Sequence, residues 1–225
     1  DAHSYNKGGL VLHMLRNYVG DDAFFAGLNK YLSDNEYSDV EAHELRLAFE
    51  DVTGEDLNWF FDQWYFESGH PMLEVSYEYD EVNKIASVQV EQVQNPQHQP
   101  AIFQMPVTID IYKYNGQVEQ HNIWINERRQ VFEFEVSEKP SLINFDAEKM
   151  LLCEKVENKT EEEYLFQYRN APKFLDRYEA LDNLANSENP NILAIFEEAL
   201  NDEFYVIRAL SLSVATLTES ILPKV

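Results

Sequence analysis

The spacing of hydrophobic residues changes twice along this chain of 225 residues. Up to residue 71, apolar residues recur at intervals of three and four, the period of an amphipathic helix. Two stripes show this spacing clearly: Leu45, Ala48, Phe49 and Val52, then Leu57, Phe60, Phe61 and Trp64. We therefore expect four short helices over residues 1–71, and we interpret the aromatic residues of the second stripe as core residues.

Residues that commonly start or stop a helix lie at the predicted helix ends. Ser38 with Glu41 matches a capping box, and Asp56 is a suitable N-cap. Gly54 and Gly69 fall where a glycine in the left-handed conformation often ends a helix. These signals support the helical interpretation and set the expected boundaries.

Between residues 72 and 157 apolar and polar residues alternate, which predicts strands with one buried face. The alternation covers five segments: 73–79, 86–93, 106–114, 118–125 and 131–136. Asn115-Gly116 is typical of a tight hairpin turn between the third and fourth of them. The regular spacing of strands and turns predicts a small antiparallel β-sandwich.

The helical period returns over residues 158–225, together with an internal repeat. Arg177, Leu181 and Leu184 are echoed 31 residues later by Arg208, Leu212 and Ala215. A period near 31 residues is short for a HEAT repeat but suits a helical solenoid. Two repeats are too few to be stable alone, so we expect the array to continue.

The predicted fold class is therefore multidomain α+β. Residues 1–71 form a helical part, residues 72–157 a β-sandwich, and residues 158–225 the beginning of a HEAT-like α-solenoid.

The composition excludes several classes of function. With 41 acidic and 17 basic residues, the formal net charge is -24, which disfavours binding to nucleic acid and to anionic membranes. No apolar run approaches the roughly 18 residues of a membrane span. A single cysteine, Cys153, excludes a disulfide framework and a cysteine-rich zinc site, and we expect it in the core. The compartment stays open between cytoplasmic, periplasmic and secreted.

The motifs for metal binding are incomplete. His43-Glu44 opens a stretch that resembles HExxH, but Leu47 stands where the second histidine ligand is needed. We therefore interpret His43 as a solvated helix residue. No complete nucleophile or nucleotide-binding motif is present either.

The first predicted helix has an unusual start. Gly8 and Gly9 each cost about 1 kcal/mol in a helix, and the close approach of another backbone or a ligand would compensate. Tyr5 precedes them, and a phenol is a neutral donor suited to an oxyanion. From spacing alone, a packed ring with a hydrated hydroxyl is the stronger interpretation of Tyr5.

Tyr5-Asn6-Lys7-Gly8, with the helical residues that follow, resembles the YxKG helix of zinc aminopeptidases that have a thermolysin-like (gluzincin) catalytic domain. This family includes the puromycin-sensitive and endoplasmic-reticulum aminopeptidases. The resemblance continues through residues 41–57 and 59–75, and the family has the same order of β-sandwich and helical superhelix. It implies that Tyr5 donates a hydrogen bond to the tetrahedral intermediate of peptide hydrolysis. Lys7 and Gly8 are then structural residues at the helix start.

The HExxH motif, the third zinc ligand and the GxMEN loop of the family are absent, and in the family they precede YxKG. We therefore expect a C-terminal portion of a longer zinc aminopeptidase that acts on peptide substrates. This chain alone should bind no catalytic zinc and be inactive; its substrate-binding residues are unknown. Its partner would be the N-terminal catalytic portion of the same polypeptide, and without it the chain could self-associate.

Two alternatives remain open. The chain could belong to a non-catalytic homologue that acts as a protein-interaction scaffold through its sandwich and solenoid. It could also belong to a related zinc endopeptidase or another hydrolase with a similar tyrosine.

Overall fold

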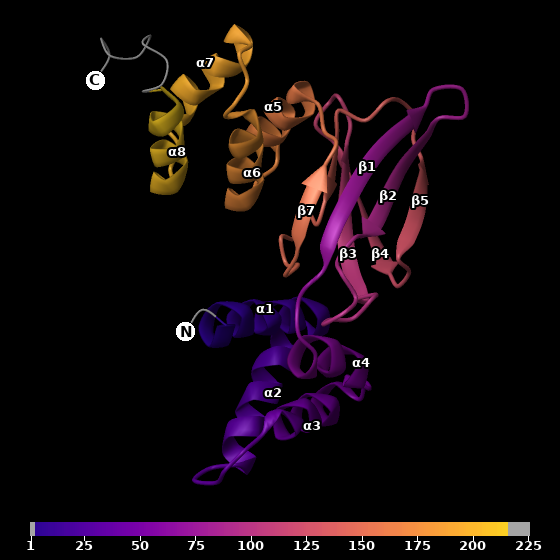
Figure 1. Ribbon diagram of the computed structural model, residues 1–225, viewed down its shortest axis with the longest axis vertical. Helices are drawn as coiled ribbons and strands as arrows, with labels where there is room; N and C mark the ends of the chain where they lie inside the picture. Colours follow the sequence, from indigo (N-terminus) through magenta and orange to yellow (C-terminus); the bar gives the residue numbers. More distant parts are fainter. Residues whose placement is uncertain (1–2, 216–225) are drawn as a thin grey trace.

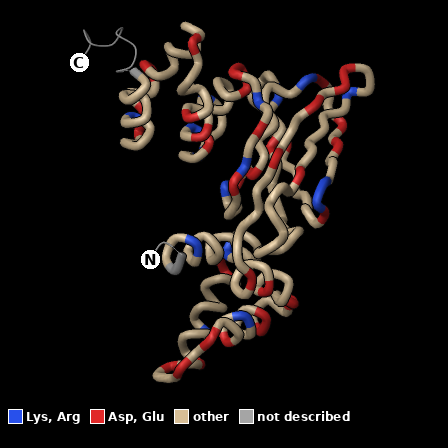
Figure 2. The backbone as a smooth tube through the Cα atoms, in the orientation of Figure 1, with Lys and Arg blue, Asp and Glu red and all other residues tan. Residues whose placement is uncertain are grey.

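The computed structural model describes residues 3–215. Helices lead into two β-sheets, and a second set of helices follows them, so the chain is α+β as its hydrophobic periods predict (Figure 1). Acidic residues occur in all three parts of the chain (Figure 2). None of the described helices is long and apolar enough to cross a membrane.

The first part contains four helical runs. A π-helical turn η1 continues into α1, and the short α4 continues into a second π-helical turn η2. The bounds are η1 His3–Lys7, α1 Gly8–Val19, α2 Asp21–Asp34, α3 Ala42–Thr53, α4 Asn58–Phe61 and η2 Asp62–Phe66.

The predicted capping box of Ser38 with Glu41 is wrong. The Ser38 hydroxyl donates to the carbonyl of Asn35 at 2.8 Å, so it is used in the turn that follows α2. Glu41 is instead the N-cap of α3, and its N–H donates to the Glu44 carboxylate at 2.8 Å. The capping box therefore lies one turn later than the sequence pattern indicated.

The other boundary residues agree with the sequence in part. Gly54 ends α3 in the left-handed conformation, as expected. The Asp56 carboxylate accepts from the N–H of Asn58 at 2.8 Å, but the N-cap of α4 is Leu57. Gly69 has a positive φ of 83° yet lies beyond the end of η2, so it does not cap that helix.

The strands form two sheets. The bounds are β1 Met72–Asp80, β2 Ile85–Gln92, β3 Met105–Tyr112, β4 Val118–Ile125, β5 Arg129–Glu135, β6 Leu142–Phe145 and β7 Glu154–Glu157. One sheet has the order β5-β2-β1-β7 and the other β4-β3-β6. Asn115 and Gly116 make the turn between β3 and β4, and Lys113 N–H donates to the Gln117 carbonyl at 2.8 Å across it.

Two features of the sheets differ from the prediction. β6 and β7 are additional strands of four residues each, and β7 pairs in parallel with β1, so the sandwich is not purely antiparallel. β6 is buried at all four positions and therefore lacks the alternating pattern of a half-exposed strand.

One hydrophobic core joins the helical part to both sheets. It includes residues of α1, α3, α4 and η2 together with inward-facing residues of the strands. Phe60, Phe61 and Trp64 are at most 3% exposed, which confirms their assignment to the core. The Trp64 ring lies 5.0 Å from the ring of Phe103, at the edge of the sandwich. The helical part and the sandwich thus share their buried surface.

The last part consists of two helix pairs with a core of their own. The helices are α5 Glu161–Asn170, α6 Phe174–Leu184, α7 Pro190–Ala199 and α8 Tyr205–Ala215. Asn189 caps α7, and Pro190 occupies its first position, which requires no N–H. Arg177 on α6 lies 2.9 Å from Asp202, in the loop before α8. The pairing agrees with the repeat, whereas its continuation as a HEAT-like array stays a prediction.

Candidate functional site at the first helix

Tyr5 lies in η1, the π-helical turn that leads into α1, and is 80% exposed. A π-helical turn within a helix is uncommon and is often found at functional sites. The phenol is therefore accessible to a substrate or to another part of a larger protein. Its exposure is compatible with both interpretations of the sequence.

Lys7 has a contact that sequence reasoning missed. Its Nζ donates to the carbonyl of Gly69 at 2.9 Å, and this bond links two segments 62 residues apart. Gly69 belongs to the connection between η2 and β1. Lys7 therefore does more than start a helix, because it attaches the turn that carries Tyr5 to the edge of the sandwich.

Gly8 and Gly9 lack the close neighbour that was expected. A Cβ atom built at either residue would meet nothing within 4 Å among the described residues. The expectation of a close approach at these glycines is therefore not met within residues 3–215.

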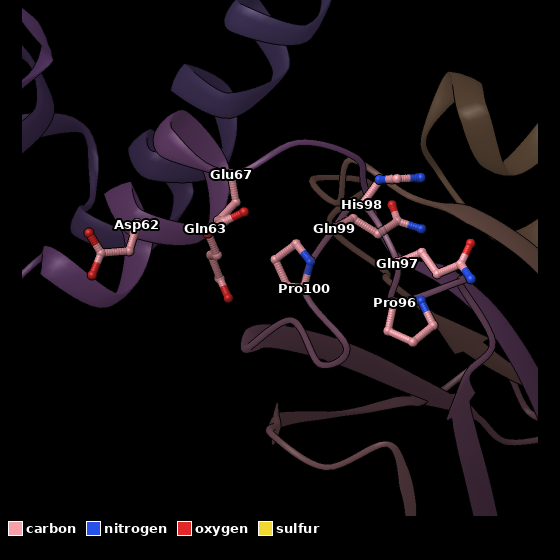
Figure 3. A pocket seen from close by; sticks show the side chains of 8 residues that line it. All are labelled: Asp62, Gln63, Glu67, Pro96, Gln97, His98, Gln99 and Pro100. Atoms are coloured by element: carbon pink, nitrogen blue, oxygen red, sulfur yellow. The ribbon is translucent and has the colours of Figure 1, made fainter.

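A groove of about 570 Å³ lies where η2 faces the loop between β2 and β3 (Figure 3). Its lining mixes polar and apolar side chains and comes from two segments: Asp62, Gln63 and Glu67, then residues 96–100. The Gln63 amide donates to the Gln104 carbonyl at 2.6 Å and accepts from the Gln104 N–H at 2.8 Å. Its polar atoms are thus used inside the protein. Asp62 points away from the loop in Figure 3.

The histidines are dispersed. His43 is exposed on α3, as expected, and its ring lies 4.9 Å from that of Phe66. His70 Nε2 lies 2.9 Å from Glu154 Oε1. Over residues 3–215 no group of three or more His, Cys, Asp or Glu side chains is arranged to hold a metal ion.

Cys153 packs against the main core and is half-buried. Burial raises the pKa of its thiol to about 12. A thiol that stays protonated at neutral pH is a poor nucleophile. The residue is therefore structural, as its apolar surroundings in the sequence indicated.

A buried group of charged residues between the sandwich and the C-terminal helices was also missed by sequence reasoning. We call it the junction cluster; it consists of Lys149, Lys155, Glu157, Lys159, Asp176 and Glu179. Lys149 Nζ lies 3.0 Å from Asp176 Oδ1 and 2.8 Å from Glu179 Oε2. Lys155 Nζ lies 2.9 Å from Glu157 Oε2, and Lys159 Nζ lies 2.9 Å from Glu157 Oε1. The cluster joins β7 to α6.

Attraction to the neighbouring lysines keeps the Glu157 and Glu179 carboxylates ionised. Burial would raise the pKa of Glu157, but Lys159 and Lys155 outweigh it and hold the pKa well below its ordinary value. Burial would also raise the pKa of Glu179, but Lys155 and Lys149 outweigh it and lower the pKa. Because the charges face one another, the cluster is a structural junction. Its one sequence signal is the presence of three lysines within residues 149–159 of an acidic chain.

Comparison with known proteins places the first part of the chain in a family context. Residues 1–64, which include Tyr5 and Lys7, match the peptidase family M1 domain. Aminopeptidase N of Haemophilus influenzae is 32% identical over 142 residues, which are 58% of this chain and 16% of that protein. Aminopeptidase A of Gloydius brevicauda is 35% identical over 75 residues, 33% of this chain and 8% of that protein.

The fold has a counterpart among solved structures. Legionella pneumophila aminopeptidase A, crystallised in complex with aspartic acid, superposes with a TM-score of 0.74 at 19% identity. The match covers 90% of this chain and 25% of that chain. The chain thus spans about a quarter or less of the proteins it matches. The resemblance to gluzincin aminopeptidases found in the sequence is confirmed.

Proposed function

Because this chain resembles the M1 aminopeptidases, we propose that it forms part of a zinc aminopeptidase that removes N-terminal residues from peptides. In this proposal Tyr5 donates a hydrogen bond to the oxyanion of the tetrahedral intermediate. The observation that carries it is Tyr5-Asn6-Lys7-Gly8 at the start of an M1-matching segment, with Tyr5 exposed on the turn before α1.

The chemistry assigned to Tyr5 needs no change in its protonation. A neutral phenol can donate a hydrogen bond at pH 7, and a donor placed where negative charge develops lowers the barrier to reaction. The residues that the structure describes do not fit a zinc site, so none of them is assigned as a zinc ligand. The zinc that the family implies belongs to the rest of the enzyme.

The three parts of the chain receive corresponding roles. Residues 1–71 complete the catalytic domain, residues 72–157 are the sandwich domain, and residues 158–225 begin a HEAT-like helical domain. Large apolar side chains exposed on the helical part support a missing neighbour: Leu10, Phe25, Leu32, Leu47 and Phe66. The N-terminal catalytic portion of the same polypeptide would cover them, and the chain alone would be inactive and able to self-associate.

The test is Tyr5→Phe in the complete enzyme. Loss of one oxyanion donor should lower kcat by about 10²–10³-fold while the zinc content stays the same. Tyr37→Phe is the matched control, because Tyr37 is 98% exposed and lies in the loop after α2. Normal turnover of Tyr5→Phe would refute the role of Tyr5. A complete enzyme without peptidase activity would instead favour the non-catalytic scaffold.

A further inference from the structure

We infer that Lys7 is a positioning residue, which holds the turn carrying Tyr5 against a polar lock between residues 67–71 and the 95–100 loop of the sandwich. This inference rests on the proposed function and deepens it, because it makes the sandwich part of the support of Tyr5.

The first step is the contact itself. Lys7 lies in the same π-helical turn as Tyr5, two residues further on, and is half-buried. Its Nζ donates to the Gly69 carbonyl at 2.9 Å. A hydrogen bond from an ammonium is stronger than one between neutral groups. Lys7 can therefore restrain η1 relative to the segment that follows η2.

The Lys7 ammonium binds the Gly69 carbonyl although this chain is rich in carboxylates, and this choice of acceptor bears on its role. Its 41 acidic residues offer many possible partners, yet no described carboxylate lies within ion-pairing distance of the Lys7 ammonium. The ammonium instead binds a backbone carbonyl, whose place is fixed by the fold. Such a contact sets position rather than neutralising charge.

The second step is the rigidity of the acceptor. Gly69 has a φ of 83°, a conformation that other residues rarely adopt. A Cβ atom there would lie 1.9 Å from the Oε1 atom of Gln99 and 2.6 Å from its Cβ atom. Gln99 is therefore packed directly on the Gly69 backbone, which leaves the peptide little freedom to move.

Further hydrogen bonds tie the same two segments together. The N–H of His70 donates to Gln99 Oε1 at 3.3 Å, and Gln99 Nε2 donates to the Asn95 carbonyl at 3.0 Å. The Ser68 hydroxyl donates to the carbonyl of His98. Figure 3 shows His98 and Gln99 on the loop that faces the η2 turn. The Gly69 carbonyl is thus fixed to the sandwich.

The third step concerns what restrains the turn besides the Lys7 contact. A Cβ atom built at Gly8 or Gly9, the two residues that follow the turn, would meet nothing within 4 Å among the described residues. With Lys7 removed, η1 would keep its connection to α1 but lose its attachment to residues 67–71. A small displacement of a catalytic group can cost about 10²-fold in rate, so this attachment should matter for turnover.

The kinetic test uses Lys7→Met in the complete enzyme, in the native and the Tyr5→Phe background. Lys7→Met should lower kcat about 10-fold or more with a much smaller change in KM, and should have little further effect when Tyr5 is already Phe. Lys7→Arg, which keeps a donor, should restore part of the rate. Gln99→Ala should also lower kcat, because it removes the side chain that is packed on Gly69. Lys30→Met, on α2, is the control and should leave kcat unchanged, because the ion pairs of Lys30 are with Asp34 and Asp51 and not with the turn that carries Tyr5. Equal effects of Lys7→Met in both backgrounds would overturn the inference.

A spectroscopic test separates this inference from the role of Tyr5. In the complete enzyme, 3-fluorotyrosine at position 5 should give a ¹⁹F signal whose shift or line width changes on Lys7→Met but not on Lys30→Met. If Tyr5→Phe retains normal turnover, the proposed role of Tyr5 is wrong. The ¹⁹F signal then still tests whether Lys7 positions the turn. An unchanged signal in Lys7→Met overturns the positioning role, whatever the kinetics show.

Discussion

The sandwich has two junctions with helices, and they are built on different physical principles. At the first, α1, α4 and η2 share one hydrophobic core with both sheets. At the second, the sandwich and the C-terminal helices have separate cores. They meet through the junction cluster and a small apolar cluster of Tyr112, Leu142 and Ala171. A shared core makes two elements one unit, whereas a buried ionic junction fixes an orientation but carries the cost of dehydrating its charges.

The proposed active site lies at the first of these junctions. Tyr5 lies on the side where the helices and the sandwich share a core, and Lys7 adds one polar contact to that junction. The C-terminal helices are attached through a small apolar cluster and through charges, and the charges respond to pH and substitution. Substitutions at the two junctions should therefore give different patterns of unfolding.

The largest effect is expected from Glu157→Gln. Glu157 is the partner of both Lys155 and Lys159, and it accepts from the Tyr77 hydroxyl. Its loss leaves two buried ammonium groups under-paired, which should cost about 3–5 kcal/mol in the free energy of unfolding. Denaturant unfolding followed by hydrogen exchange should show α5 and α6 opening before β2 and β3.

The comparison predicts how this defect can be repaired. Lys159→Met combined with Glu157→Gln removes one buried charge together with its partner, and should recover part of the lost stability. If Glu157→Gln destabilises all three parts equally, the two junctions are not independent.

A smaller effect is expected at the first junction from Gln63→Leu. The Gln63 amide is the partner of both the N–H and the carbonyl of Gln104, and leucine would leave these groups unpaired. The expected cost is about 1–3 kcal/mol. Because the core is shared, helices and sandwich should still unfold in one transition, which circular dichroism and tryptophan fluorescence can compare. Separate transitions would contradict the shared core.

Acid should weaken the second junction selectively. The pKa values of Glu157 and Glu179 are lowered in the folded protein, so these groups contribute stability above their unfolded pKa. That contribution is lost as the pH falls below about 4.5, through the folded values. Asp146 opposes the trend, because burial raises its pKa.

Hydrogen exchange of α5 and α6 measured at decreasing pH checks this expectation. Exchange should rise there more than in β2 and β3, and the pH dependence should be shallower in Glu157→Gln. Acid sensitivity confined to the first part of the chain would contradict it.

The smallest effect is expected from an exposed ion pair of the same chemistry. Arg169 Nη2 lies 3.0 Å from Glu198 Oε2, and both side chains are about half exposed. Arg169→Ala should change the free energy of unfolding by about 0–1 kcal/mol, because water and salt screen the pair. Thermal unfolding measures it. A loss as large as that of Glu157→Gln would show that burial is not what distinguishes the junction cluster.

The residues show which features a linear pattern can reveal. Helical stripes and alternation predicted the helices and the strands β1 to β5, because apolar residues recur in them at the helical or the strand period. β6 is buried at every position and so shows no alternation. β7 has four residues, and its place in the sheet comes from parallel pairing with β1. Ser38 is a preferred N-cap residue and glutamate is not, so the pattern placed the capping box one turn before its position at Glu41 and Glu44.

The polar contacts of the site could be predicted only in part. Tyr5 was found through the YxKG resemblance, and its exposure agrees with a free phenol. The bond from Lys7 to Gly69 joins residues 62 positions apart and involves a backbone carbonyl, which leaves no trace in residue spacing. Lysines near β7 normally indicate a solvated strand, and here the packing of α5 and α6 buries them.

The central claim, that Tyr5 stabilises the transition state, is tested most directly with a phosphinate peptide, which imitates the tetrahedral intermediate. The inhibition constants of the native enzyme and Tyr5→Phe should be compared with their kcat/KM values. If Tyr5 contacts the oxyanion, affinity for the phosphinate should fall by about the same factor as kcat/KM, with the affinity for an uncleaved peptide nearly unchanged. Unchanged phosphinate affinity in Tyr5→Phe would contradict the claim.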